Sequence, residues 1–132
     1  MKTIYLGLMA AILSTAPAHA QSSIERRYSK EFSQCMDQSG GGDSAMRDCY
    51  GNEIGLQDAR LNQAYVMIMR RLSPAKKSDL RTSERLWIRQ RDIKCERHAA
   101  QEKGGTLYFV MLDACVLDET IKRTLFLENY NG

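Results

Sequence analysis

The chain has 132 residues, 43% of them hydrophobic and 27% charged, and a formal net charge of +3. This length excludes two ordinary domains. The charge is unevenly distributed, because residues 70–103 carry a net +6, whereas residues 21–69 and 104–132 each carry −2.

The first twenty residues have the pattern of a secretory signal peptide. Lys2 precedes a short apolar run at residues 4–13, and Ala-His-Ala at residues 18–20 matches a cleavage site. The run is too short to span a membrane, and no cysteine near the cleavage site offers a lipid anchor. We therefore expect a single mature domain at residues 21–132, periplasmic or secreted, with no transmembrane segment.

Glycine and proline signals divide the mature chain into four pieces. The breaks are Gly40-Gly41-Gly42, Ser73-Pro74 and Gly104-Gly105. Between the breaks, apolar residues recur at spacings of three and four, and no stretch shows the alternation of a strand. The pattern predicts an all-α fold with helices at residues 23–38, 43–72, 74–101 and 106–128.

The four cysteines fit this division. An even number of cysteines in an exported chain favours disulfides over metal binding. Cys35 and Cys49 fall symmetrically about the first glycine cluster, and Cys95 and Cys115 fall symmetrically about the second. Antiparallel helices bring together residues equidistant from their turn. We therefore expect Cys35–Cys49 and Cys95–Cys115 bonds, in a small antiparallel bundle of two stapled helical hairpins.

No catalytic pattern stands out. The chain lacks GxSxG, HExxH, CxxC and CxxCH, and the mature part contains one histidine, His98, at a polar helix end. The carboxylates are scattered, and none forms an evident acid–base pair. We expect a binding protein and not an enzyme, with no metal and no cofactor.

The basic segment provides a candidate binding face. Lys77, Arg81, Arg85 and Arg89 are spaced by four residues and form a cationic stripe along one helix. Such a stripe is either an ordinary solvated surface or a contact for an anionic envelope polymer or an acidic protein cleft. We do not expect nucleic acid as the partner of an exported protein.

A second group of residues predicts a structural polar network. Arg91 lies on the same helical face as Trp87 and Cys95, where an unpaired charge would be costly. It should reach the bundle edge or an acid on another helix. Trp87 is expected to be a core anchor, and the other expected members of the network are Glu53, Asp58, Asn62, Tyr65 and Asp118.

Two motifs in these segments resemble a known family. The LNxxY element ends at Tyr65, and the WxxxRDxxC element ends at Cys95. Over residues 30–128 the chain resembles the LprI-type lysozyme inhibitor domain, long classed as a domain of unknown function. The resemblance implies an exported, disulfide-bonded helical domain that binds a protein. The family is named after a mycobacterial lipoprotein that inhibits lysozyme, whereas this chain has no lipobox cysteine.

Two functional hypotheses follow. In the first, the chain blocks lysozyme by occluding the active-site cleft with a cation from Arg81, Arg85, Arg89 or Lys103, the last of which adjoins a glycine turn. In the second, it is a structural or envelope-stress protein whose basic face contacts anionic envelope components.

Overall fold

The computed structural model describes residues 23–131, which contain four α-helices and no strand. The helices are α1 (Lys30–Gln38), α2 (Asp43–Arg71), α3 (Pro74–Ala99) and α4 (Leu107–Glu128). Two short 3-10 helices, η1 (Glu25–Arg27) and η2 (Ala100–Glu102), precede α1 and follow α3. The all-α prediction is confirmed, and the expected signal peptide lies outside the described residues.

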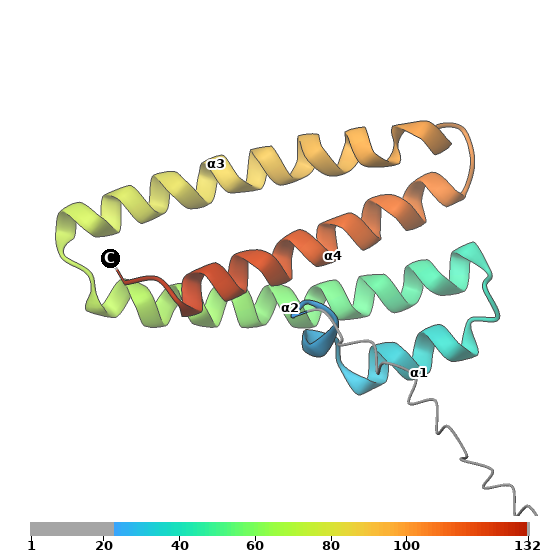
Figure 1. The fold of residues 1–132 in the computed structure, drawn as a ribbon, viewed down its shortest axis with the longest axis horizontal. Coiled ribbons are helices and arrows are strands. Elements are labelled where there is room, and N and C mark those ends of the chain that lie inside the picture. Colours follow the sequence, from blue (N-terminus) through green and yellow to red (C-terminus); the bar gives the residue numbers. More distant parts are fainter. Residues whose placement is uncertain (1–22, 132) are drawn as a thin grey trace, which may run out of the picture.

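The helices form two hairpins that share one bundle (Figure 1). The α1–α2 hairpin is joined through Ser73 to the α3–α4 hairpin, and α4 lies between α2 and α3 (Figure 1). Helix α1 is much shorter than α2 and therefore covers only its first half (Figure 1). Of the helices described, none is both long and apolar enough to cross a membrane.

The first predicted helix is wrong at its start. Residues 23–38 do not form one helix, because the chain is extended at Tyr28 and Ser29 between η1 and α1. Ser29 caps α1, and its hydroxyl oxygen accepts a 2.9 Å hydrogen bond from the Phe32 backbone N–H. The other three predicted helices agree with the structure to within one or two residues at their ends.

Glycine makes both hairpin turns possible. Gly40, Gly41 and Gly104 have φ values of 60°, 77° and 97°, and no other described residue has a positive φ. Side chains other than glycine rarely adopt this conformation. Ser73 and Pro74 instead begin α3, with the Ser73 hydroxyl as its cap and proline in the first turn.

The apolar core consists of two clusters. One joins α2, α3 and α4 near the Ser73 connection, through Leu61, Ile68, Leu80 and Leu127. The other joins α1, α2 and α4, through Phe32, Cys49, Leu117 and Ile121. Helix α4 contributes residues to both clusters, so its burial stabilises the packing of the two hairpins against each other.

Both predicted disulfides are confirmed. Cys35–Cys49 fastens α1 to α2 with a Cα–Cα distance of 5.7 Å, and Cys95–Cys115 fastens α3 to α4 with a distance of 5.4 Å. No cysteine among the described residues is free. Each bond lies close to its own glycine turn.

We predict that non-reducing peptide mapping of the purified protein recovers these two pairs. The double substitution Cys95→Ala/Cys115→Ala opens a loop with a sequence separation of 20 residues. It should lower the free energy of unfolding, measured in urea, by about 3 kcal/mol, because the unfolded chain regains the entropy of that loop. Peptides that join Cys35 or Cys49 to either of the other two cysteines would contradict the hairpin arrangement.

Candidate functional site: a basic helix face and an interhelical polar cluster

The basic stripe of α3 turns outward along the helix. A step of four residues advances about 40° around an α-helix, so a stripe with this spacing drifts from one side to another. Lys77 is half-buried at its inner end, whereas Arg81, Arg85 and Arg89 are exposed. No ion pair within residues 23–131 engages these three arginines.

Exposed apolar side chains lie beside the outer end of this stripe. Leu86 is 46% exposed and Ile93 is 58% exposed, and a separation of seven residues puts them on one side of α3. Arginine next to accessible apolar side chains is a typical composition of protein-binding surfaces. The outer face of α3 is therefore free to contact a partner.

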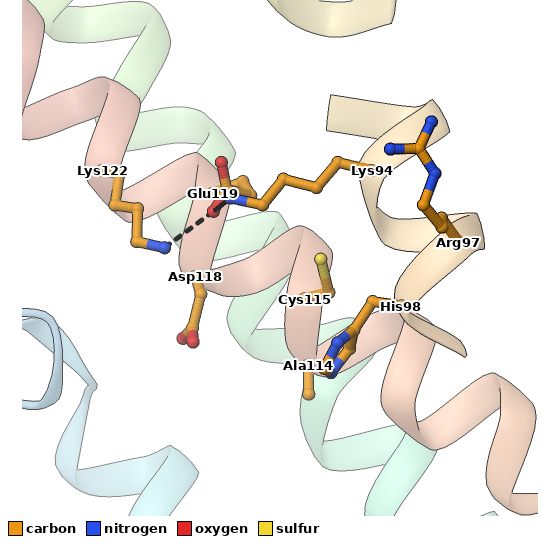
Figure 2. A pocket seen from close by; sticks show the side chains of 8 residues that line it. All are labelled: Lys94, Arg97, His98, Ala114, Cys115, Asp118, Glu119 and Lys122. Atoms are coloured by element: carbon orange, nitrogen blue, oxygen red, sulfur yellow. Dashed lines mark hydrogen bonds and ion pairs between the residues drawn. The ribbon is translucent and has the colours of Figure 1, made fainter. Parts of the chain in front are cut away.

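A pocket of about 430 Å³ lies where α3 and α4 face each other near the disulfide (Figure 2). Lys94 crosses from α3 to Glu119 on α4, at 2.8 Å, and Lys122 donates to the same carboxylate at 2.7 Å (Figure 2). Arg97 points away from this cluster, whereas His98 lies close to Ala114 (Figure 2). The pocket is thus lined by three cations and two carboxylates, Asp118 and Glu119, and the second of these is shared between two of the cations.

The shared carboxylate has a perturbed pKa. Partial burial by itself would raise the pKa of Glu119, but the hydrogen bonds and charges of Lys122 and Lys94 outweigh it and lower the pKa below its usual range. Glu119 therefore stays ionised and holds the two lysines together. The negative charge of Glu119 also offsets part of the positive charge of Lys94 and Lys122 at the pocket.

Five of the seven residues predicted for the polar network meet in one hollow. The hollow of about 280 Å³ lies between α2 and α3. The five are Asp58, Asn62 and Tyr65 from α2 and Trp87 and Arg91 from α3. Arg91 lies over the Trp87 ring, 5.1 Å from its centre, and pairs at 2.8 Å with Asp92, its neighbour in sequence. None of the acids on α2 or α4 that were expected for Arg91 pairs with it.

Glu53 and Asp118 lie elsewhere. Glu53 is 2% exposed and accepts hydrogen bonds from the Ser29 backbone N–H at 3.0 Å, the Ser29 hydroxyl at 2.5 Å and the Gln57 amide at 2.7 Å. It therefore holds the start of α1 against α2. These hydrogen bonds commit Glu53 to the α1–α2 hairpin, and Arg91 of α3 pairs with Asp92 instead.

Asp118 joins η1 to α4. Its carboxylate accepts a 2.6 Å hydrogen bond from the Tyr28 hydroxyl. Burial, followed by this hydrogen bond and the nearby negative charge, strongly raises the pKa of Tyr28. The phenol therefore remains a hydrogen-bond donor at any physiological pH.

The interhelical ion pair expected for Arg91 is made by Arg123 of α4. Its guanidinium pairs with Glu84 of α3 at 2.6 Å and donates to the Ser83 hydroxyl at 2.7 Å, and it lies over the rings of Trp87 and Phe126. The sequence contained a signal for this residue. Arg123 is three positions after Thr120 and four before Leu127, both buried, which places it near the inward side of α4.

Trp87 packs against the first core cluster and receives two guanidinium groups. Its surroundings are those of a core anchor, as predicted, and the cluster around it joins α2, α3 and α4. Lys103 is exposed at the turn before Gly104, away from this cluster and beyond the last turn of α3.

The fold and these surfaces define a small all-α domain of two disulfide-stapled hairpins, with an unpaired basic face on one outer helix. Comparison with known proteins gives the family. The family described as "Lysozyme inhibitor LprI" matches residues 35–127, and the chain belongs to it.

An uncharacterised protein of Rhizobium meliloti (strain 1021) is 26% identical over 141 residues, an alignment that covers 97% of this chain and 94% of the relative. No solved structure matches the chain significantly.

We predict that Arg123→Met lowers the free energy of unfolding by about 2–4 kcal/mol, because Glu84 would stay mostly buried without its cation. The side chains of Arg123 and Glu84 are only 11% and 13% exposed. Lys94→Met is the matched control, since 59% of that side chain is exposed, and it should cost less than about 1 kcal/mol. Urea unfolding of both variants measures the difference, and equal losses would contradict a structural role for the Arg123 pair.

The lowered pKa of Glu119 predicts a pH-dependent contribution to stability. A carboxyl whose pKa is lower in the folded state stabilises the protein above its unfolded pKa, about 4.3, and this stabilisation is lost as the pH falls through the folded value. The destabilisation caused by Glu119→Gln should therefore be larger at pH 7 than at pH 3 in urea unfolding.

The double variant Lys94→Met/Lys122→Met is the control for this pH effect, because it removes both groups that lower the pKa. In that background, the effect of Glu119→Gln should no longer diminish in acid. A decrease as large as that in the wild-type background would show that the lysines do not cause it.

Proposed function

We propose that this chain is an exported, non-enzymatic binding protein that inhibits a lysozyme by occluding its active-site cleft. The observation that carries the proposal is the family match, which spans residues 35–127 and includes both disulfides and most of α4. The expected signal peptide and the disulfides both support export to an oxidising compartment. The exported part would be the single domain at residues 21–132.

Charge supports occlusion of the cleft as the mode of inhibition. Glycoside hydrolases place two carboxyl groups beside the bond that they cleave, so a lysozyme cleft attracts a cation. The chain offers Arg81, Arg85 and Arg89 on α3 and Lys103 at the α3–α4 turn, all exposed. The disulfides hold these elements in place before binding, which reduces the entropy lost on association.

The test is inhibition of a basic animal lysozyme acting on bacterial cell walls. Mature, oxidised protein beginning at Gln21 should lower the rate of hydrolysis in a saturable manner. The double variant Cys95→Ala/Cys115→Ala should inhibit less, because the α3–α4 turn loses its nearby constraint. An unchanged rate with a large excess of the mature protein would overturn the proposal.

A second function has one observation in its favour. Residues 70–103 carry a net charge of +6, and Arg81, Arg85 and Arg89 are exposed on α3 without an ion pair within residues 23–131, so this helix offers a cationic surface suited to an anionic envelope polymer. Salt-sensitive binding to phosphocellulose, without any effect on lysozyme, would favour this function.

The charge-reversal triple Arg81→Glu/Arg85→Glu/Arg89→Glu should then elute from phosphocellulose at lower salt than a matched triple on other surfaces. Lys30, Arg70 and Arg71 provide that control, since all three are exposed on α1 and α2 and the change in charge is the same.

A further inference from the structure

The two glycine turns of the fold lie at one end of the molecule (Figure 1). The Thr106 hydroxyl donates a hydrogen bond to the Asp43 carboxylate, and this contact links the start of α4 to the start of α2. We call this region, residues 37–48 together with residues 100–109, the glycine-turn end. Because the α1–α2 and α3–α4 turns meet there, a partner can touch both hairpins at once.

The glycine-turn end is held rigidly. A disulfide fastens the two helices of each hairpin, five to seven residues from the first glycine turn at Cys35–Cys49 and nine to ten residues from the second at Cys95–Cys115. Arg47 connects the two hairpins, because it pairs with Asp113 at 3.1 Å and lies over the Phe109 ring, 4.7 Å from its centre. A surface fixed in this way loses little conformational entropy when it binds.

Lys103 is the outermost cation of this end. It is exposed, and no ion pair in the described part of the chain involves it. Gly104 follows it with a φ of 97°, and no atom lies within 4 Å of the position that a Cβ would take there. Open space therefore borders the turn at Gly104, and Lys103 beside it is accessible to a partner.

The same end of the molecule also carries acidic residues, at the start of α2. Asp43 and Asp48, together with Arg47, Phe109 and two smaller side chains, line a hollow of about 400 Å³ between the two hairpins. Phe109 is 46% exposed at its edge. Arg47 already occupies the face of this ring and Asp43 accepts from Thr106, but Asp48 is exposed and makes no ion pair within residues 23–131, so its carboxylate can pair with a cationic side chain.

We infer that the glycine-turn end is the surface that contacts the lysozyme: Lys103 enters the acidic cleft, and the hollow beside Asp43 and Asp48 receives a basic side chain from the cleft's rim. The inference rests on the proposed function. Its basis is charge complementarity, since a basic enzyme with an acidic cleft matches a surface that carries both an accessible cation and a hollow lined by carboxylates. The outer face of α3 carries only unpaired cations in its stripe and would repel such a rim.

The experiment compares inhibition constants against a basic animal lysozyme. Lys103→Glu and Asp48→Lys should each raise the inhibition constant at least roughly tenfold, because each replaces an attraction with a repulsion. Both residues are exposed and lie outside the two core clusters, so the urea unfolding midpoints of the variants should match the wild type. Lys76→Glu, an equal charge change on an exposed residue at the opposite end of α3, should alter inhibition less than about threefold.

Two other results would overturn the inference, and they are distinguishable. If the wild-type protein does not inhibit, the proposed function itself fails and the inference fails with it. If the wild type inhibits, Lys103→Glu has no effect, and Arg81→Glu/Arg85→Glu/Arg89→Glu abolishes inhibition, the function stands and the contact lies on α3. Retained inhibition by that triple variant, together with loss in Lys103→Glu and Asp48→Lys, is the result expected.

Discussion

The burial of α4 between α2 and α3 constrains where every other feature of this chain can lie. Leu117, Ile121 and Leu127 are almost completely buried on α4; Leu127 belongs to the first core cluster, and the other two belong to the second. Thr120 and Thr124 are buried beside them and donate their hydroxyls to carbonyl oxygens one turn earlier, so these polar groups need no partner on another helix. Small, internally satisfied side chains let the neighbouring helices approach α4 closely.

This arrangement leaves α3 exposed over much of its surface. It reaches the bundle through Leu80, the cluster at Trp87 and the disulfide at Cys95, which follow one another along its inward side. Few apolar side chains of α3 are buried, so they contribute little to its packing against the bundle. The Arg123–Glu84 ion pair and the disulfide therefore do much to hold α3 in place. A protein with a larger apolar contact at α3 would have less of the helix available to a partner.

The helices, the turns and the disulfides were predictable because each depends on local spacing. Helical periodicity identifies the inward side of a helix, and the glycine clusters mark the points about which Cys35 and Cys49, or Cys95 and Cys115, are symmetric. The break before α1 was missed because the helical spacing of the sequence continues through Ser29. In the structure the Ser29 hydroxyl instead caps α1 and the backbone there is extended.

The polar partners were harder to predict, because periodicity does not say which helix faces which. Arg91 and Glu53 both lie on inward sides of their helices, yet Glu53 bonds to Ser29 and Gln57, Arg91 pairs with its neighbour Asp92, and the ion pair between helices joins Arg123 to Glu84. Asp58, Asn62 and other network members meet because α2 and α3 are still adjacent near the Ser73 connection. The position of a residue along α2 or α3 therefore decides whether it faces the other helix or α4. Helical periodicity cannot supply this information, because it depends on the tertiary fold.

The distribution of charge matters more for recognition than its sum. At physiological ionic strength, interactions between exposed charges are screened over about 8 Å, so a partner responds to the few groups that face it. The net charge of +3 would predict repulsion from a basic enzyme, yet the glycine-turn end carries Asp43 and Asp48 as well as Lys103. A chain that is basic overall can in this way present a mixed surface to a basic partner, while the cations of α3 keep the rest of the molecule from competing for the same contact.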